Sequence, residues 1–186
     1  SIGLVGSEMC IRDRYYPHAL GERNEKKKLY NTQSPMCTSL YKPNESLISL
    51  YNNLEVSYLK NETETETIAL DTFVSKYNID EIDLIKIDVQ GAELDVFKGG
   101  KNSLKNVLNI ICEVEFVSMY ENQPLFGDVN NFLSKYEFMF QKFLTIAGRT
   151  LKPLKPKNPI AASHHMWADA VYIRHVEKIQ NLSDEK

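Results

Sequence analysis

Apolar positions along the chain recur with the periods of helices and strands. In residues 70–77 and 129–136 they fall at i, i+3, i+4 and i+7, which is one face of an amphipathic helix. Residues 82–89 and 107–114 are instead apolar almost throughout, too densely for a sheet with one wet face and over too few positions for a good helix. The pattern therefore predicts two amphipathic helices and two buried strands of the parallel type.

Further strands are expected at residues 138–146 and 166–175, and the short apolar stretch 15–20 resembles the tail of a strand. Residues 62–67 alternate Glu and Thr, which predicts an exposed strand. A short helix is expected at 91–98, closed by two glycines that can adopt a left-handed cap.

Polar and turn-forming residues mark the connections. Residues 31–45 are rich in Ser, Thr, Pro and Asn and predict a long loop, and a helical turn is expected at 47–51. Residues 151–159 combine prolines with lysines and predict a stiff, solvated loop. Strands that alternate with helices over short connections predict an α/β domain with a mostly parallel sheet. In such sheets, ligands bind outside the carboxyl ends of the strands.

Composition narrows the class of protein without naming a function. The 186 residues carry 22 Lys and Arg against 25 Asp and Glu, a net charge of −3, which gives no electrostatic signature for nucleic acid or an anionic membrane. No apolar run is long enough to span a bilayer. Cys10, Cys37 and Cys112 lie far apart, which favours free thiols in a reducing, cytoplasmic setting.

Three regions are distinguished along the chain. Residues 1–14 (SIGLVGSEMCIRDR) resemble a translated sequencing-adapter tail and are predicted to be a non-native leader. Residues 15–176 are expected to form the domain, and 177–186 a polar tail.

The densest chemical signal is IKIDVQGAE, residues 85–93. Asp88 follows a predicted strand, Gly91 permits a tight turn, and Glu93 lies in the first turn of a helix. Asp88 can accept a hydrogen bond from a ligand or a substrate hydroxyl. It can equally cap the helix, with Glu93 complementing the helix dipole, or pair with Lys86 on the same strand face.

Glu113 and Glu115 end the next strand at the same edge of the sheet. Carboxylates gathered in one crevice raise each other's pKa, as a general base near neutrality requires. Asp88, Glu93 and Glu113 can alternatively bind a divalent cation, as in a metal-dependent hydrolase, although the spacing of His18, His164, His165 and His175 suggests no metal triad. We predict no metal site.

Four segments in order, LDTF, IDLIKIDVQGAELDVFKGG, IICEVEFVSMYENQPLF and MWADAVYIR, closely resemble the FkbM-type methyltransferases. The resemblance covers residues 15–175. It implies a Rossmann-like fold that binds S-adenosylmethionine and transfers its methyl group to a nucleophile, usually a hydroxyl. The family's first strand with its glycine-rich loop, and its second strand with a ribose-binding acidic residue, have no match here. The chain is therefore expected to be an N-terminally truncated fragment.

The resemblance also assigns residues to roles. Asp88 would lie near the transferred methyl group, with Val89 and Gln90 lining the cofactor. His18, Ala19 and Leu20 would approach the adenine. Asp88 or Glu113 would orient or deprotonate the acceptor hydroxyl.

The function expected from this resemblance is O-methylation of a small molecule or glycan. A non-catalytic remnant or binding module of the same fold is the alternative. Oligomeric state and the acceptor itself are not readable from the residues.

Overall fold

The computed structural model describes residues 14–177, so most of the expected leader and most of the polar tail lie outside the described residues. The strands are β1 (Ala19–Gly21), β2 (Glu25–Thr32), β3 (Leu59–Ala69), β4 (Leu84–Ile87), β5 (Asn109–Glu115), β6 (Phe138–Arg149) and β7 (His164–Arg174). The α-helices are α1 (Glu45–Ile48), α2 (Leu70–Lys76), α3 (Glu93–Lys98) and α4 (Phe126–Lys135). Short 3-10 turns occupy Pro35–Cys37, Glu55–Ser57 and Ser103–Lys105. No helix of this region is long and apolar enough to cross a lipid bilayer.

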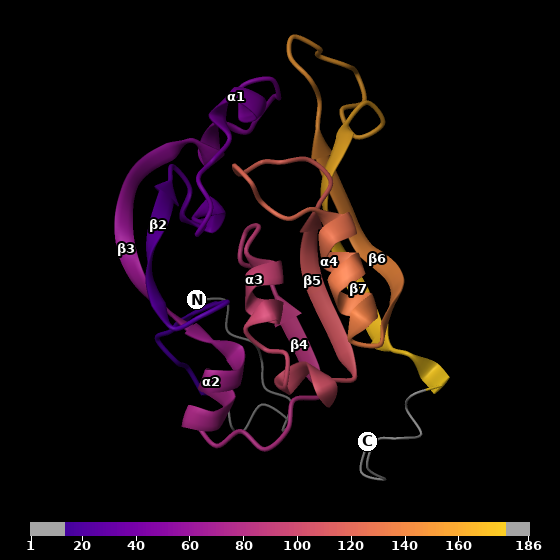
Figure 1. The fold of residues 1–186 in the computed structure, drawn as a ribbon. Helices are drawn as coiled ribbons and strands as arrows, with labels where there is room; N and C mark the ends of the chain where they lie inside the picture. The colour runs from indigo at the N-terminus through magenta and orange to yellow at the C-terminus, as the bar shows by residue number, and fades with distance from the viewer. Residues whose placement is uncertain (1–13, 178–186) are drawn as a thin grey trace.

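The strands form two sheets, with orders β1-β3-β2 and β4-β5-β7-β6. Figure 1 shows the curved β2–β3 ribbon on one side, the four-stranded sheet on the other and α3 between them.

The α/β class predicted from the sequence is confirmed, but the expectation of a mostly parallel sheet is wrong for the described chain. Only β1–β3 and β4–β5 run parallel. The β2–β3, β5–β7 and β6–β7 pairs are antiparallel. Parallel neighbours need a crossover connection, whereas β6 and β7 are joined by an irregular loop at 150–163.

The hydrophobic core lies on one face of the four-stranded sheet. Ile110, Cys112 and Val114 alternate along β5 and are fully buried there. Phe97 of α3 and Leu133 of α4 cover them and are equally inaccessible. Cys112 is thus the small buried hydrophobe that its position in an apolar strand predicted.

The predicted helices and strands are present, but β2 was not predicted and its end lies in the segment expected to be a loop. Two further details differ. β4 is not buried on both faces, because Leu84 is 53% exposed and no described helix covers that side. Gly99 does not adopt a left-handed cap, since its φ is −76°. Glycine is needed there for close packing instead: a Cβ on Gly99 would collide with the carbonyl oxygen of Gly21, and one on Gly100 would lie 2.6 Å from Leu70 Cδ2.

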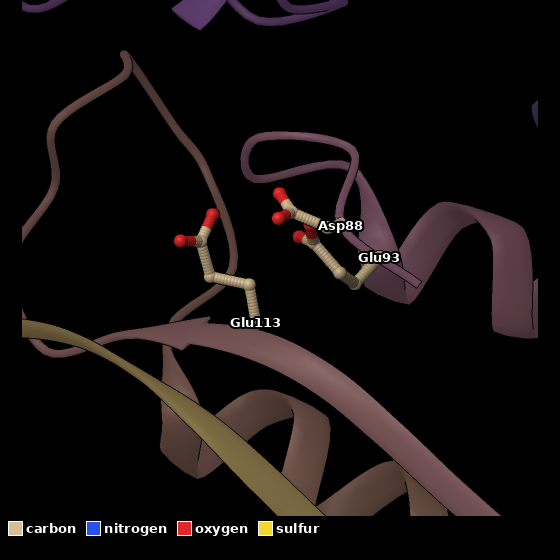
Figure 2. Close-up of side chains that lie close together, drawn as sticks. All are labelled: Asp88, Glu93 and Glu113. Atoms are coloured by element: carbon tan, nitrogen blue, oxygen red, sulfur yellow. The ribbon is translucent and has the colours of Figure 1, made fainter. Parts of the chain in front are cut away.

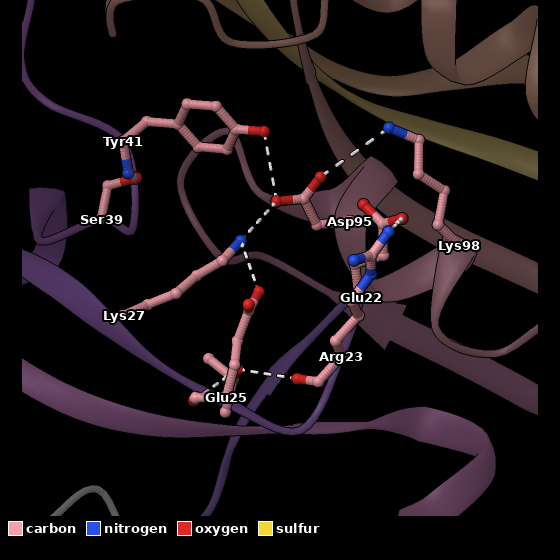
Figure 3. Close-up of polar contacts among 9 residues, drawn as sticks. Glu22, Arg23, Glu25, Lys27, Ser39, Tyr41, Asp95 and Lys98 are labelled. Atoms are coloured by element: carbon pink, nitrogen blue, oxygen red, sulfur yellow. Dashed lines mark hydrogen bonds and ion pairs between the residues drawn. The ribbon is translucent and has the colours of Figure 1, made fainter.

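The buried carboxylate of Asp95 joins α3 to the β1-β3-β2 sheet (Figure 3). Asp95 of α3 is only 5% exposed. Its Oδ2 accepts hydrogen bonds from Lys27 Nζ of β2 at 3.3 Å and from the Tyr41 hydroxyl at 3.2 Å. Lys98 Nζ lies 3.9 Å from the other oxygen. Because a desolvated carboxylate must be paired, these contacts fix the ribbon against α3.

Arg174 closes the opposite end of the core and gives the first prediction. Its guanidinium donates to the carbonyl oxygens of Leu104, Val107 and Tyr136, and it lies 4.3 Å from the ring centre of Phe138. Arg174→Ala would leave three carbonyls without these donors. We expect the free energy of unfolding, measured by urea denaturation, to fall by about 3 kcal/mol.

Arg23→Ala is the matched control, because Arg23 is exposed and pairs only with Glu22 at the surface. Its effect should stay within about 0.5 kcal/mol. Equal losses for the two variants would contradict the structural role of Arg174.

Candidate functional site

The candidate site lies where the parallel strands β4 and β5 end. Asp88 follows β4 directly, and Glu113 and Glu115 close β5. The chain then reverses sharply: Gln90 has φ 55° and Gly91 has φ 92°, both left-handed. At Gly91 a Cβ would also lie only 3.2 Å from Gln123 Nε2. The glycine that the sequence marked as a turn is therefore required by both conformation and space.

Gln90 holds the two predicted catalytic carboxylates together. Its side-chain Nε2 donates to Asp88 Oδ1 at 2.7 Å and to Glu113 Oε2 at 2.8 Å. Its Oε1 accepts from the Tyr120 hydroxyl at 3.2 Å, and its backbone oxygen accepts from Ser39 Oγ at 2.6 Å. Both amide hydrogens and both oxygens of this residue are thus engaged, which immobilises the side chain between the two carboxylates.

A third carboxylate, that of Glu93, lies next to that of Asp88 (Figure 2). Glu93 is 2% exposed, and its Oε1 accepts a hydrogen bond from the backbone N–H of Val89 at 2.8 Å. One carboxylate oxygen each from Asp88, Glu93 and Glu113 lies within 4.8 Å of the others. Crowding like charges at this separation favours the protonated forms.

Burial and mutual repulsion shift the pKa values of this group upward. The pKa of Glu113 is raised to about 8, first by burial and then by the charges of Asp88 and Glu93. Burial also raises the pKa of Glu93 to about 7. Glu115, 4% exposed beside them, has a pKa raised well above its ordinary value for the same reason. Protons are therefore shared among these groups near neutral pH.

The three clustered carboxylates offer the oxygen ligands that Mg²⁺ or Ca²⁺ prefers. One oxygen of each carboxylate already accepts a hydrogen bond, from Gln90 Nε2 at Asp88 and Glu113 and from the Val89 N–H at Glu93. The cluster by itself therefore carries no metal assignment.

Two hollows meet at Asp88 and Gln90. The first, the β1–β4 cavity, has a volume of about 610 Å³. Its lining residues are His18, Ala19, Leu20, Leu29, Pro35, Met36, Thr38, Ser39, Leu40, Lys86, Ile87, Asp88, Val89 and Gln90. All six residues that the sequence assigned to cofactor binding line this one cavity. His18 is held in place by a 2.6 Å hydrogen bond between its Nε2 and the Tyr77 hydroxyl.

The second hollow, the β5 cleft, has a volume of about 340 Å³. It is lined by Ser34, Met36, Cys37, Leu54, Val56, Ser57, Asp88, Gln90, Glu113, Glu115, Met119, Tyr120, Arg149 and Trp167. Glu113 and Glu115 both face it, because the β5–β7 ladder has no bulge between them. Asp88 and Gln90 therefore form a partition with one hollow on each side.

Two structural alternatives for Asp88 are wrong. It does not cap α3, because the N-cap residue is Ala92 and there is no side-chain capping hydrogen bond. Nor does it pair with Lys86, whose Nζ lies 2.8 Å from Asp169 Oδ1 on β7. Lys86 is thus paired with Asp169, two strands away in the sheet, rather than with Asp88, its neighbour along the chain. Only the sheet order reveals this partner.

Ser39 and Tyr120 belong to the site but were not singled out from the sequence. Ser39 lies in a loop whose composition marks only flexibility, and it reaches Gln90 across 51 positions of the chain. Tyr120 lies within the segment IICEVEFVSMYENQPLF that resembles a known family, and this was the available signal.

Comparison with known proteins identifies the family of this chain. A profile of the methyltransferase FkbM domain matches residues 8–140, well over half of the chain. The chain belongs to the FkbM methyltransferase domain family. A relative named 2-O-methyltransferase NoeI, from Sinorhizobium fredii, is 38% identical over 76 residues. That alignment covers 41% of this chain and 31% of the relative's length. No solved structure matches the chain significantly.

The raised pKa of Glu113 in this FkbM domain predicts how stability depends on pH. In the folded chain the carboxyl stays protonated up to pH 8, whereas unfolded it ionises at its ordinary 4.5. Unfolding therefore releases a proton between these values. The contribution of Glu113 to stability should therefore be greatest below about pH 4.5 and fall as the pH rises towards 8. Glu113→Gln keeps the bond from Gln90 and should be more stable than the parent at pH 8, by an amount on the order of 2 kcal/mol.

The measurement is urea denaturation at several pH values between 4.5 and 8. Glu121→Gln serves as control, since Glu121 is half-exposed and pairs with Lys42 on the surface. Parallel pH curves for the parent and Glu113→Gln would show that Glu113 is not the group responsible.

Proposed function

We propose that this chain is the part of an S-adenosylmethionine-dependent O-methyltransferase that positions an acceptor hydroxyl, on a small molecule or a glycan, against the methyl donor. The observation that carries the proposal is the partition made by Asp88 and Gln90 between the β1–β4 cavity and the β5 cleft. A transfer between two bound molecules needs two adjoining compartments whose reactive atoms meet at one wall.

The residues of the β1–β4 cavity suit the proposed cofactor. Leu20, Leu29 and Val89 offer an apolar slot for an adenine ring, and Asp88 offers a carboxylate for a cationic group. The cavity volume is within the range of cofactor sites. When bound, S-adenosylmethionine supplies an electrophilic methyl group on a sulfonium sulfur.

The carboxylates of the β5 cleft suit the acceptor side. A hydroxyl placed beside Glu113 loses its proton to that carboxylate as its oxygen forms the bond to the methyl carbon. The bound cofactor would supply this methyl group from its sulfonium sulfur and would become a neutral thioether. A base with a pKa near 8 is well matched to this task near neutral pH. Asp88, fixed by Gln90, orients the hydroxyl.

A second candidate is a non-catalytic binding module of the same fold. The chain spans less than a third of the length of the curated relative that it matches. Binding of S-adenosylmethionine separates the two functions, because a binding module without cofactor chemistry does not need the β1–β4 cavity. The free thiols at Cys37 and Cys112 fit the reducing, cytoplasmic setting that either function implies here.

S-adenosylmethionine should therefore bind the chain and raise its melting temperature. Ala19 lines the β1–β4 cavity, so Ala19→Leu should fill part of it and weaken binding at least tenfold by isothermal titration calorimetry. Ala161→Leu, a change of the same size on an exposed loop, should leave binding unchanged. If the parent chain shows no binding at millimolar cofactor, the binding-module function replaces the enzyme.

Methyl transfer should depend on Glu113. With tritiated S-adenosylmethionine and a panel of monosaccharides and oligosaccharides as acceptors, the rate should rise with pH towards a midpoint near 8. Glu113→Gln should lower the turnover number about 100-fold or more and abolish that rise. An unchanged pH profile in Glu113→Gln would remove Glu113 from the role of base.

A further inference from the structure

Arg149 is the one basic residue among the described residues that line the β5 cleft. The other polar side chains at the reactive end of that cleft, those of Asp88, Gln90, Glu113 and Glu115, are acidic or neutral. Arg149 lies at the end of β6, opposite His164 of β7. The β5 cleft is thus lined both by the carboxylates of Asp88 and Glu113 and by one permanently charged group, the guanidinium of Arg149.

The guanidinium of Arg149 is held in place but not neutralised. It lies 4.9 Å from the ring centre of Trp167, a cation–π contact, and its Nη1 donates to the Gly148 carbonyl oxygen at 2.9 Å. Its Nε is buried and has no hydrogen-bond partner among the described residues, and no described carboxylate forms an ion pair with it.

Arg174, unlike Arg149, has no guanidinium nitrogen without a hydrogen-bond partner. Arg174 is 4% exposed, and each of its three guanidinium nitrogens donates to a backbone carbonyl. A structural arginine in this chain is thus fully engaged. Leaving a buried donor without an acceptor costs free energy, which a bound ligand would recover.

The sheet register places this cation close to the acceptor hydroxyl of the proposed reaction. Trp167 lies directly opposite Glu115, which is two residues from Glu113 on the same face of β5. Two residues of strand span about 7 Å and adjacent strands lie about 5 Å apart, so the guanidinium is on the order of 10 Å from the Glu113 carboxylate. That separation is comparable with the width of one sugar ring with its substituents.

We propose that Arg149 and Trp167 form an anion subsite, so that the acceptor of this chain carries a carboxylate or phosphate group about one ring away from its reacting hydroxyl. Trp167 packs against the guanidinium, and an anion that reaches the buried Nε–H would accept a hydrogen bond from it and a parallel one from an adjacent Nη–H. The identification of the ligand as an acceptor rests on the proposed function, whereas the binding of an anion at Arg149 does not. Selectivity for charged over neutral sugars is the consequence.

The test measures binding without cofactor and without turnover. In ¹⁵N-labelled protein, the Nε–Hε resonance of Arg149 is followed during titration with D-glucuronate, D-glucose 6-phosphate and D-glucose. We expect the two anionic sugars to shift this resonance and neutral glucose to leave it in place. A response to glucuronate alone or to the phosphate alone identifies the anionic group and supports the subsite.

Variants separate recognition by Arg149 from a structural effect. Arg149→Gln should weaken binding of the responding sugar at least tenfold, and Arg149→Lys, which keeps the charge but loses the paired donors, should give an intermediate loss. Arg23→Gln, an exposed arginine outside the cleft, should bind like the parent. Arg149→Lys carries the test if Arg149→Gln does not fold.

Equal binding of glucose and glucuronate, no response of the Arg149 resonance to either anion, or parental affinity in both Arg149 variants would overturn the proposal. Failure of S-adenosylmethionine to bind would overturn the proposed function instead. Because the titrations use no cofactor, the two failures are distinguishable.

Discussion

The hydrogen bonds of the Gln90 amide are the constraint on which the site depends. One nitrogen donates to the carboxylates of Asp88 and Glu113, which would otherwise repel each other at the ends of adjacent parallel strands. The oxygen atoms of the same residue engage Tyr120 and Ser39, which come from distant parts of the chain. Gln90, whose backbone is left-handed, lines both hollows where they adjoin. Under the proposed function, groups held this rigidly need no rearrangement during reaction.

The site also depends on how the two sheets are fixed to each other. The β1–β3–β2 sheet contributes one wall of the β1–β4 cavity, whereas β4 contributes the other. Asp95 connects them through Lys27 and Tyr41 (Figure 3), and burial together with the neighbouring Asp95 charge keeps the pKa of Tyr41 high, so its hydroxyl remains a donor.

Stability and chemistry make opposite demands on this edge of the sheet. Glu93, Glu113 and Glu115 are desolvated together, which costs stability whenever they ionise. The same desolvation gives Glu113 a pKa useful to a base near neutrality. The apolar core behind them, with Cys112, Val114 and Phe97 fully buried, offsets this cost. The left-handed residues and the charged groups therefore lie at the carboxyl ends of β4 and β5, whereas regular apolar packing fills the core.

The sequence by itself determined most of the elements, although not β2, and the main members of the site. Periodic apolar positions located α2 and α4, dense apolar runs located β4 and β5, and the IKIDVQGAE segment with its family resemblance identified Asp88, Gln90 and Glu113 as residues of one edge. Tertiary structure alone decided the antiparallel β6–β7 pairing, the partnership of Lys86 with Asp169, and the meeting of Arg149 and Trp167 with the carboxylates. The reason is physical: periodicity reports which face of a segment is buried, whereas a side chain's partner depends on which strands become neighbours across long stretches of chain.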